Sequence, residues 1–267
     1  MSAAIRAELR KILTTRLWWV LLLAQAGYLG FIGLVMAFSF TVDLTEAGAA
    51  AGPVMSGVDT ATATYSLVNS IGYVFPLVIG SLAVTTEFRH RTIAQTLLVE
   101  PRRGVVLGAK LIATLPVGLL FGVVGVVSLV GAAAPLLTWQ GDGAFLTDPE
   151  VLKILALGVV VMALWALIGA AFGSVVTNQV AAVVVILAFT QLVEPIARLA
   201  LSSVDALSGV ARFLPGAAAD AVIGASFYDE IAASTSLSRP GGLAVLLGYA
   251  AVLAVVGRFT TLRRDLA

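Results

Sequence analysis

The sequence has 267 residues, of which 60% are hydrophobic and 12% are charged, with a net charge of +1 and no cysteine. A soluble globular domain carries roughly 25% charged residues, so a chain this poor in charge is predicted to be an integral membrane protein. The absence of cysteine excludes disulfides, thiolate metal sites and cysteine nucleophiles. The apolar runs are continuous rather than alternating, which favours membrane-spanning helices over the strands of a barrel.

Two elements are predicted at the N-terminus. Residues 2–16 carry Ile5, Leu9 and Ile12 at helical spacing among charged residues, as in an amphipathic helix that lies in the membrane interface. A positively charged flank without a defined helix is the alternative. Residues 17–40 are uncharged and exceed the roughly 20 residues that cross a bilayer, so we expect a first span that is retained and not cleaved as a signal peptide.

Five further spans are predicted, at about 67–86, 111–134, 154–176, 180–193 and 241–257. The fourth and fifth share one uncharged stretch, and its polar break at 177–179 predicts a tight turn. Residues of about 194–239 are rich in Ala, Ser and Gly and lightly charged, which predicts short external helices that pack back on the spans or dip into the membrane. The prediction is a single all-α domain over residues 1–267, a polytopic membrane protein with six transmembrane helices.

Two GxxxG pairs allow helices in a membrane to approach closely. They are Gly118 with Gly122 and Gly169 with Gly173. We interpret both as packing within one subunit rather than as a dimer face.

Charge is divided unequally between the connections. The N-terminal flank, residues 87–110, the 177–179 turn and the C-terminal tail hold twelve basic and four acidic residues, a net +8. The other connections hold four basic and eleven acidic residues, a net −7. Because basic residues gather in cytoplasmic connections, both termini and residues 87–110 are predicted to be cytoplasmic, in a protein of the cell inner (plasma) membrane.

The connection at 87–110 reads EFRHRTIAQTLLVEPRRGVVLGAK. Thr92 and Gln95 match a capping box, and Pro101 prevents continuation of the helix that it would start. This predicts a short helix at about 92–99 whose apolar positions include Leu97 and Leu98. A short helix that exposes leucine among arginines suits a socket on another protein. Anionic membrane lipids would also explain the arginines, but they explain the apolar helix between them less well.

This connection resembles a cytoplasmic connection of the permease subunits of ABC-2 type transporters. The matching residues are Glu87, Arg89, Thr92, Thr96, Leu97, Leu98, Pro101, Arg103 and Lys110. In that family the helix is a coupling helix that seats in a groove of a separate cytoplasmic ATPase subunit. The resemblance implies that the contact is made by Glu87, Arg89, Arg91, Thr92, Ile93, Thr96, Leu97, Leu98, Pro101 and Arg103. Anchoring at the membrane edge is the alternative role for Glu87 and Lys110.

The resemblance further implies a second permease subunit, identical or diverged, around a path lined by spans one, two and five. The polar candidates on those spans are Gln25, Tyr28, Asn69, Tyr73, Thr190 and Gln191. Each equally suits a hydrogen bond to a neighbouring helix. A path without fixed charge suits an amphipathic or apolar cargo, such as a drug, antibiotic, peptide or lipid, and suits an inorganic ion poorly.

No catalytic chemistry is predicted for this chain. Gly104 to Lys110 fails as a phosphate loop because three residues, not four, separate its glycines and Ala109 precedes the lysine. ATP and Mg are therefore expected on the partner ATPase. His90 is the only histidine, which excludes a histidine triad or a multi-histidine metal site within one chain, and we expect no metal site. We also expect no cofactor in this chain and no nucleic-acid partner. Glu194 is interpreted as the start of the external segment rather than as a cargo contact.

Two functions remain open at this point. The first is the permease subunit of an ATP-driven ABC-2 type exporter. The alternative is a membrane scaffold or a lipid-modifying membrane enzyme. An enzyme would need acids, histidine or serine clustered at the interface, and the sequence shows no such cluster.

Overall fold

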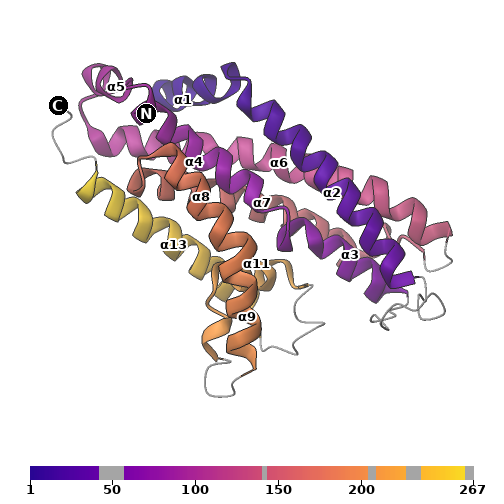
Figure 1. The fold of residues 1–267 in the computed structure, drawn as a ribbon. Coiled ribbons are helices and arrows are strands. Elements are labelled where there is room, and N and C mark those ends of the chain that lie inside the picture. The colour runs from indigo at the N-terminus through magenta and orange to yellow at the C-terminus, as the bar shows by residue number, and fades with distance from the viewer. Residues whose placement is uncertain (42–56, 140–142, 204–208, 227–235, 262–267) are drawn as a thin grey trace.

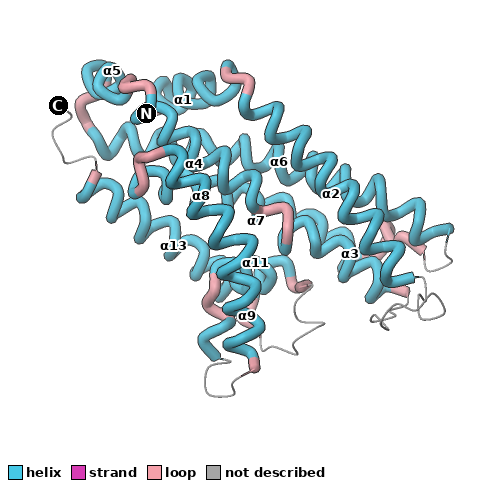
Figure 2. The backbone as a smooth tube through the Cα atoms, viewed as in Figure 1, coloured by secondary structure: helices cyan, strands magenta, loops and turns pink. Residues whose placement is uncertain are grey.

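A computed structural model describes residues 1–41, 57–139, 143–203, 209–226 and 236–261. The regular structure in these ranges is helical throughout (Figures 1 and 2). Among the described residues, six helical segments are long and apolar enough to cross a membrane. The protein is therefore an all-α, polytopic, membrane-embedded protein, which confirms the fold class predicted from composition.

The helices run in one elongated bundle (Figure 1). In chain order they are α1 (Ser2–Thr14), α2 (Leu17–Thr41), α3 (Val58–Ser70), α4 (Val74–Arg89), α5 (Ile93–Val99), α6 (Arg103–Trp139), α7 (Pro149–Val175), α8 (Gln179–Ala188), a π-helical turn (Phe189–Val193), α9 (Glu194–Ser202), α11 (Pro215–Ile223) and α13 (Arg239–Thr260). The N-terminus, α1, α5, the start of α6 and the end of α13 lie together at one end of the bundle (Figure 1). We call this the basic end, after the ten described arginines and lysines of the predicted cytoplasmic group. They are Arg6, Arg10 and Lys11 on α1, Arg258 on α13, and Arg16, Arg89, Arg91, Arg102, Arg103 and Lys110.

The centre of the bundle is α7, which contacts α3, α4, α6, α11 and α13. Glycines make the closest of these crossings possible. A Cβ atom on Gly169 would lie 2.0 Å from the carbonyl oxygen of Leu77 in α4, and one on Gly118 would lie 2.6 Å from the Cα of Ala163 in α7. The interpretation of the GxxxG pairs as packing within one subunit is therefore confirmed.

The second span differs from its prediction. It begins at Val58 rather than Leu67, and it consists of α3 and α4 with a break at residues 71–73. The polar residues of α3 interrupt the apolar run by which a span is found in the sequence. In the structure hydroxyls of α3 donate to carbonyls of the same helix, as Thr64 does to Thr60 at 2.7 Å. Gly72 permits the break, since a Cβ there would lie 2.4 Å from the carbonyl oxygen of Val68.

Two other span boundaries were also set wrongly by charge or proline. The third helix starts at Arg103, before Lys110, and continues through Pro135 to Trp139. The fifth candidate span runs from Gln179 to Leu201, so the predicted boundary at Val193 is wrong. Helical backbone continues through the π-helical turn into α9, and Glu194 lies inside the fifth span.

Of the external segment predicted at 194–239, residues 194–201 belong to the fifth span, whereas α11 does pack back against the bundle. Helix α11 is buried over nearly its whole length and contacts α13, α7 and α3. Residues 204–208 and 227–235 of this segment lie outside the described residues. The predicted N-terminal helix is also confirmed, with α1 lying across the basic end and packing on α6 (Figure 1).

Candidate functional site

The short helix α5 presents an apolar tip at the basic end. The chain reverses after α4 through Arg91, whose φ of 57° lies in the left-handed region, and Thr92 donates its backbone N–H to Glu87 at 2.9 Å. The helix then covers Ile93–Val99, as predicted, and ends before Pro101. Leu98 and Val99 are 84% and 89% exposed, so the last turn of α5 offers two aliphatic side chains without cover from this chain.

The capping box predicted at Thr92 and Gln95 is wrong. Thr92 has helical φ and ψ and its side chain caps no N–H group. A capping side chain needs the extended backbone of an ordinary N-cap, which the tight turn at Arg91 does not allow here. Ile93 is also buried in this chain, so it anchors α5 and does not face a partner.

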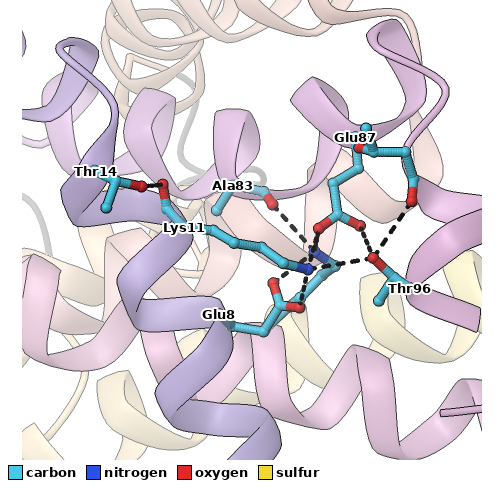
Figure 3. A network of polar contacts seen from close by, with 8 residues as sticks. Glu8, Lys11, Thr14, Ala83, Glu87 and Thr96 are labelled. Atoms are coloured by element: carbon cyan, nitrogen blue, oxygen red, sulfur yellow. Dashed lines mark hydrogen bonds and ion pairs between the residues drawn. The ribbon is translucent and has the colours of Figure 1, made fainter. Parts of the chain in front are cut away.

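Beneath α5 lies a network of ion pairs, which we call the basic-end network and define as Glu8, Lys11, Glu87 and Lys110. Lys110 contacts Glu8 at 2.7 Å and Glu87 at 2.8 Å, and Lys11 contacts the same two carboxylates at 2.7 and 2.6 Å. Glu8 and Lys11 reach the network from α1 and Glu87 from α4 (Figure 3). Two ammonium groups thus balance two carboxylates where α1, α4 and α6 meet.

The network also holds α5. The hydroxyl of Thr96 donates to Glu87 at 3.4 Å, and Lys11 donates to the Thr96 oxygen at 3.2 Å (Figure 3). Burial lowers the pKa of Lys11, but hydrogen bonds and charge attraction from Glu8 and Glu87 outweigh it and raise that pKa above 10.5. Lys11 is therefore charged at any physiological pH. Helix α5 is hydrogen-bonded to α1 and α4, and the pair of Glu87 with Lys110 extends this connection to α6.

A second group of polar side chains lies inside the bundle. We call it the central polar cluster, and its members are Asn69, Tyr73, Trp165, Glu194, Arg198, Asp220 and Ser226. Trp165 lies ten residues before the end of α7 at Val175, which is about 15 Å along the helix, so the cluster sits near the middle of a span. Its charged members are all buried.

The cluster joins the broken second span to α9 and α11. Asp220 accepts hydrogen bonds from Asn69 and from Ser226 and pairs with Arg198 at 2.7 Å. Glu194 accepts from the Tyr73 hydroxyl at 2.8 Å and from the backbone N–H of Gly216. Each carboxylate is therefore bonded within the chain, and the cluster fixes α11 against the core.

Glu194 was therefore misinterpreted as the start of an external segment, because its charge is neutralised inside the bundle. Arg198 and Asp220 were missed altogether. The available signal was the spacing of Glu194 and Arg198 by four residues in an otherwise apolar run, which places both on one helix face.

Four of the six predicted path residues point into the interior of this chain. Gln25 donates to the carbonyl of Phe121 at 3.2 Å, Thr190 bonds to its own helix, and Asn69 and Tyr73 belong to the central polar cluster. Tyr28 is partly exposed and packs against Phe75, with ring centroids 5.8 Å apart, and Gln191 is exposed. The structure thus leaves two of the six candidates at the surface.

Among the described residues, no group of three or more acidic or histidine side chains is placed to hold a metal ion. Comparison with protein-family models and with curated proteins finds no match for this chain.

Proposed function

We propose that this chain is the membrane-spanning permease subunit of an ATP-driven ABC-2 type exporter. The observation that carries the proposal is the exposed tip of α5, Leu98 and Val99, held at the basic end of a six-span bundle. Exposed aliphatic side chains on a short, fixed helix suit a groove in a partner subunit. The resemblance of residues 87–110 to the ABC-2 permeases supports a cytoplasmic ATPase as that partner, which would supply ATP and Mg.

The basic-end network supports a mechanical role for α5. A displacement of α5 acts on α4 through the turn at 90–92 and through the contact of Thr96 with Glu87. Lys110 carries the same displacement to α6, and Glu8 and Lys11 carry it to α1. Closure of the ATPase would therefore move three elements of the bundle together.

The cargo in this proposal is amphipathic or apolar, and the path lies between two copies of the permease. Much of α2, α8 and α13 exposes apolar side chains, among them Phe31, Val184 and Val252. The charged groups inside the spans are paired within the chain, in the basic-end network and in the central polar cluster. No fixed charge of that cluster is thereby offered to a path along the outer helix faces.

The test uses the affinity-tagged chain, isolated from its native membranes in mild detergent. We expect Mg-ATP hydrolysis that orthovanadate inhibits to co-purify with the wild type. Leu98→Asp with Val99→Asp should remove this activity, because a charged tip does not enter an apolar groove. The matched control is Trp139→Asp, since Trp139 is 82% exposed but lies at the opposite end of α6.

The control should keep the activity, and both variants should keep the unfolding midpoint of the wild type because the changed side chains are exposed. Undiminished ATP hydrolysis with the Leu98→Asp, Val99→Asp variant would contradict the coupling role. Loss of hydrolysis in the Trp139→Asp control as well would show that the assay does not report on α5.

A further inference from the structure

A pocket of about 580 Å³ lies at the basic end, where α6 begins and α13 ends. We call it the arginine pocket; its lining is Arg102, Arg103, Gly104, Val105, Arg258 and Phe259. It is separate from the basic-end network and from the tip of α5. Two of its guanidinium groups come from helices far apart in the sequence, Arg103 on α6 and Arg258 on α13, and the third comes from Arg102, just before α6.

The backbone of α6 makes room for this concentration of charge. A Cβ atom on Gly104 would lie 3.3 Å from the guanidinium carbon of Arg258, so the absent side chain lets that guanidinium lie over the first turn of α6. The first turn of a helix carries free N–H groups and a partial positive charge. Arg258 thus adds a cation where the field is already positive, which favours an anion in the pocket.

The acidic residue beside the pocket is already engaged. Glu100 accepts two hydrogen bonds from the Arg102 side chain, at 2.8 and 3.0 Å, and this pairing with Arg102 lowers the pKa of Glu100 to about 2. Arg258 makes no ion pair with a described residue, and its guanidinium carbon lies 5.9 Å from the ring centroid of Phe259. Positive charge therefore exceeds negative charge at the described residues of this pocket.

The level of the pocket along the membrane-spanning helices indicates where an anion would come from. Arg103 is the first residue of one candidate span, and Arg258 lies in the last turn of another. Both guanidinium groups therefore lie at the level where apolar helices leave the membrane, which is the level of lipid headgroups. Phe259 is about half exposed beside them and offers an apolar surface to the glycerol and first methylene groups of a lipid.

We propose that the arginine pocket binds a phosphate group, and that this phosphate belongs to the headgroup of an anionic phospholipid in the leaflet at the basic end. Guanidinium groups match phosphate oxygens in geometry and donate two hydrogen bonds at once. The bound headgroup would neutralise the start of α6 and the end of α13 and so hold the two helix ends together. This site depends on the membrane location of the chain and not on ATP-driven transport.

The test measures binding of short-chain phosphatidylglycerol to the purified protein in mild detergent, by native mass spectrometry across a lipid titration. We expect Arg103→Gln with Arg258→Gln to weaken binding about tenfold or more, because each arginine contributes a charge-assisted contact. Gly104→Leu should weaken binding to a similar degree, since it fills the pocket and displaces Arg258 without changing any charge. Leucine is also a good helix former, so α6 should remain intact.

The matched control is Arg6→Gln with Arg10→Gln, which removes the same charge from exposed positions on α1 at the same end. Its affinity for phosphatidylglycerol should stay within about twofold of the wild type, and zwitterionic phosphatidylcholine should bind the wild type more weakly. Equal losses in the control and in the pocket variants, or unchanged binding in both pocket variants, would overturn the site.

Two further results would overturn the lipid source. Inorganic phosphate that competes for the pocket as tightly as phosphatidylglycerol would keep the phosphate chemistry but assign it to a soluble anion. Loss of co-purifying ATP hydrolysis in Arg103→Gln with Arg258→Gln, with lipid binding unchanged, would assign the pocket to an acidic surface on a protein partner.

Discussion

Lys110→Met is expected to be among the most destabilising single substitutions at the basic end. The side chain of Lys110 is 3% exposed and contacts both Glu8 and Glu87 within 2.8 Å. Without it, two buried carboxylates share Lys11 alone, which leaves about one negative charge uncompensated. Breaking a buried ion pair in this way costs about 3–5 kcal/mol, a large part of a typical folding free energy of about 5–15 kcal/mol.

The assay is unfolding in mixed detergent micelles by increasing dodecyl sulfate, followed by tryptophan fluorescence. A charge-balanced variant, Lys110→Met with Glu8→Gln, keeps the pair of Lys11 and Glu87 and should recover most of the lost free energy of unfolding. The surface control is Lys153→Met, whose pair with Glu150 spans 3.4 Å between exposed side chains and should contribute at most about 1 kcal/mol. The reasoning fails if Lys110→Met costs no more than the control, or if the double variant costs the sum of its two single changes.

Three more predictions use the same unfolding assay. Gly169→Ala should lower the free energy of unfolding by about 1–3 kcal/mol or more, because its Cβ would collide with the backbone of α4. The control Gly131→Ala should be neutral or slightly stabilising, because a Cβ there has nothing within 4 Å. Equal effects of the two variants would contradict the packing of α4 on α7. Asp220→Ala should cost about 3–5 kcal/mol because it leaves Arg198 without its closest partner, and a loss below about 1 kcal/mol would show that the central polar cluster is not formed. Folding raises the pKa of Lys11, so its contribution to stability is fully present below pH 10.5 and is lost only as the pH rises through the raised value. The difference in unfolding free energy between the wild type and Lys11→Met should therefore stay constant from pH 7 to about pH 10. A decline of this difference within that range would contradict the ion pairing of Lys11.

Local pattern was a good guide where a segment's neighbours in sequence decide its structure. The helix at Ile93–Val99 was predicted within one residue of its observed bounds from Pro101 and the apolar positions before it, although the capping box offered as its start is absent. The amphipathic repeat of residues 2–16 correctly predicted α1. The sequence was a poorer guide to which side chains of these helices are buried, since Ile93 faces the protein's own core and not a partner.

Two charged residues lie inside helices where hydropathy predicts a membrane edge. Lys110 was placed at the start of a span and Glu194 at the end of one, because hydropathy treats a charged residue as the edge of the membrane. Both lie inside longer helices, where they meet Glu8 and Glu87 in one case and Arg198 and Tyr73 in the other. A charge can enter the apolar interior once an opposite charge or a hydrogen bond reaches it, and those partners come from remote parts of the chain.

The sequence by itself determined that this protein is a helical membrane protein with six candidate spans, because too few charged residues exist to cover a water-facing surface. It also determined the separation of basic from acidic connections and the short helix between the second and third spans. Only the tertiary structure decided which charged residues are neutralised inside, that the second span breaks at residues 71–73, and that α11 returns to the core at Asp220. These features depend on contacts between helices up to 151 residues apart, such as Asn69 with Asp220, and no local pattern specifies which distant side chain will supply the partner.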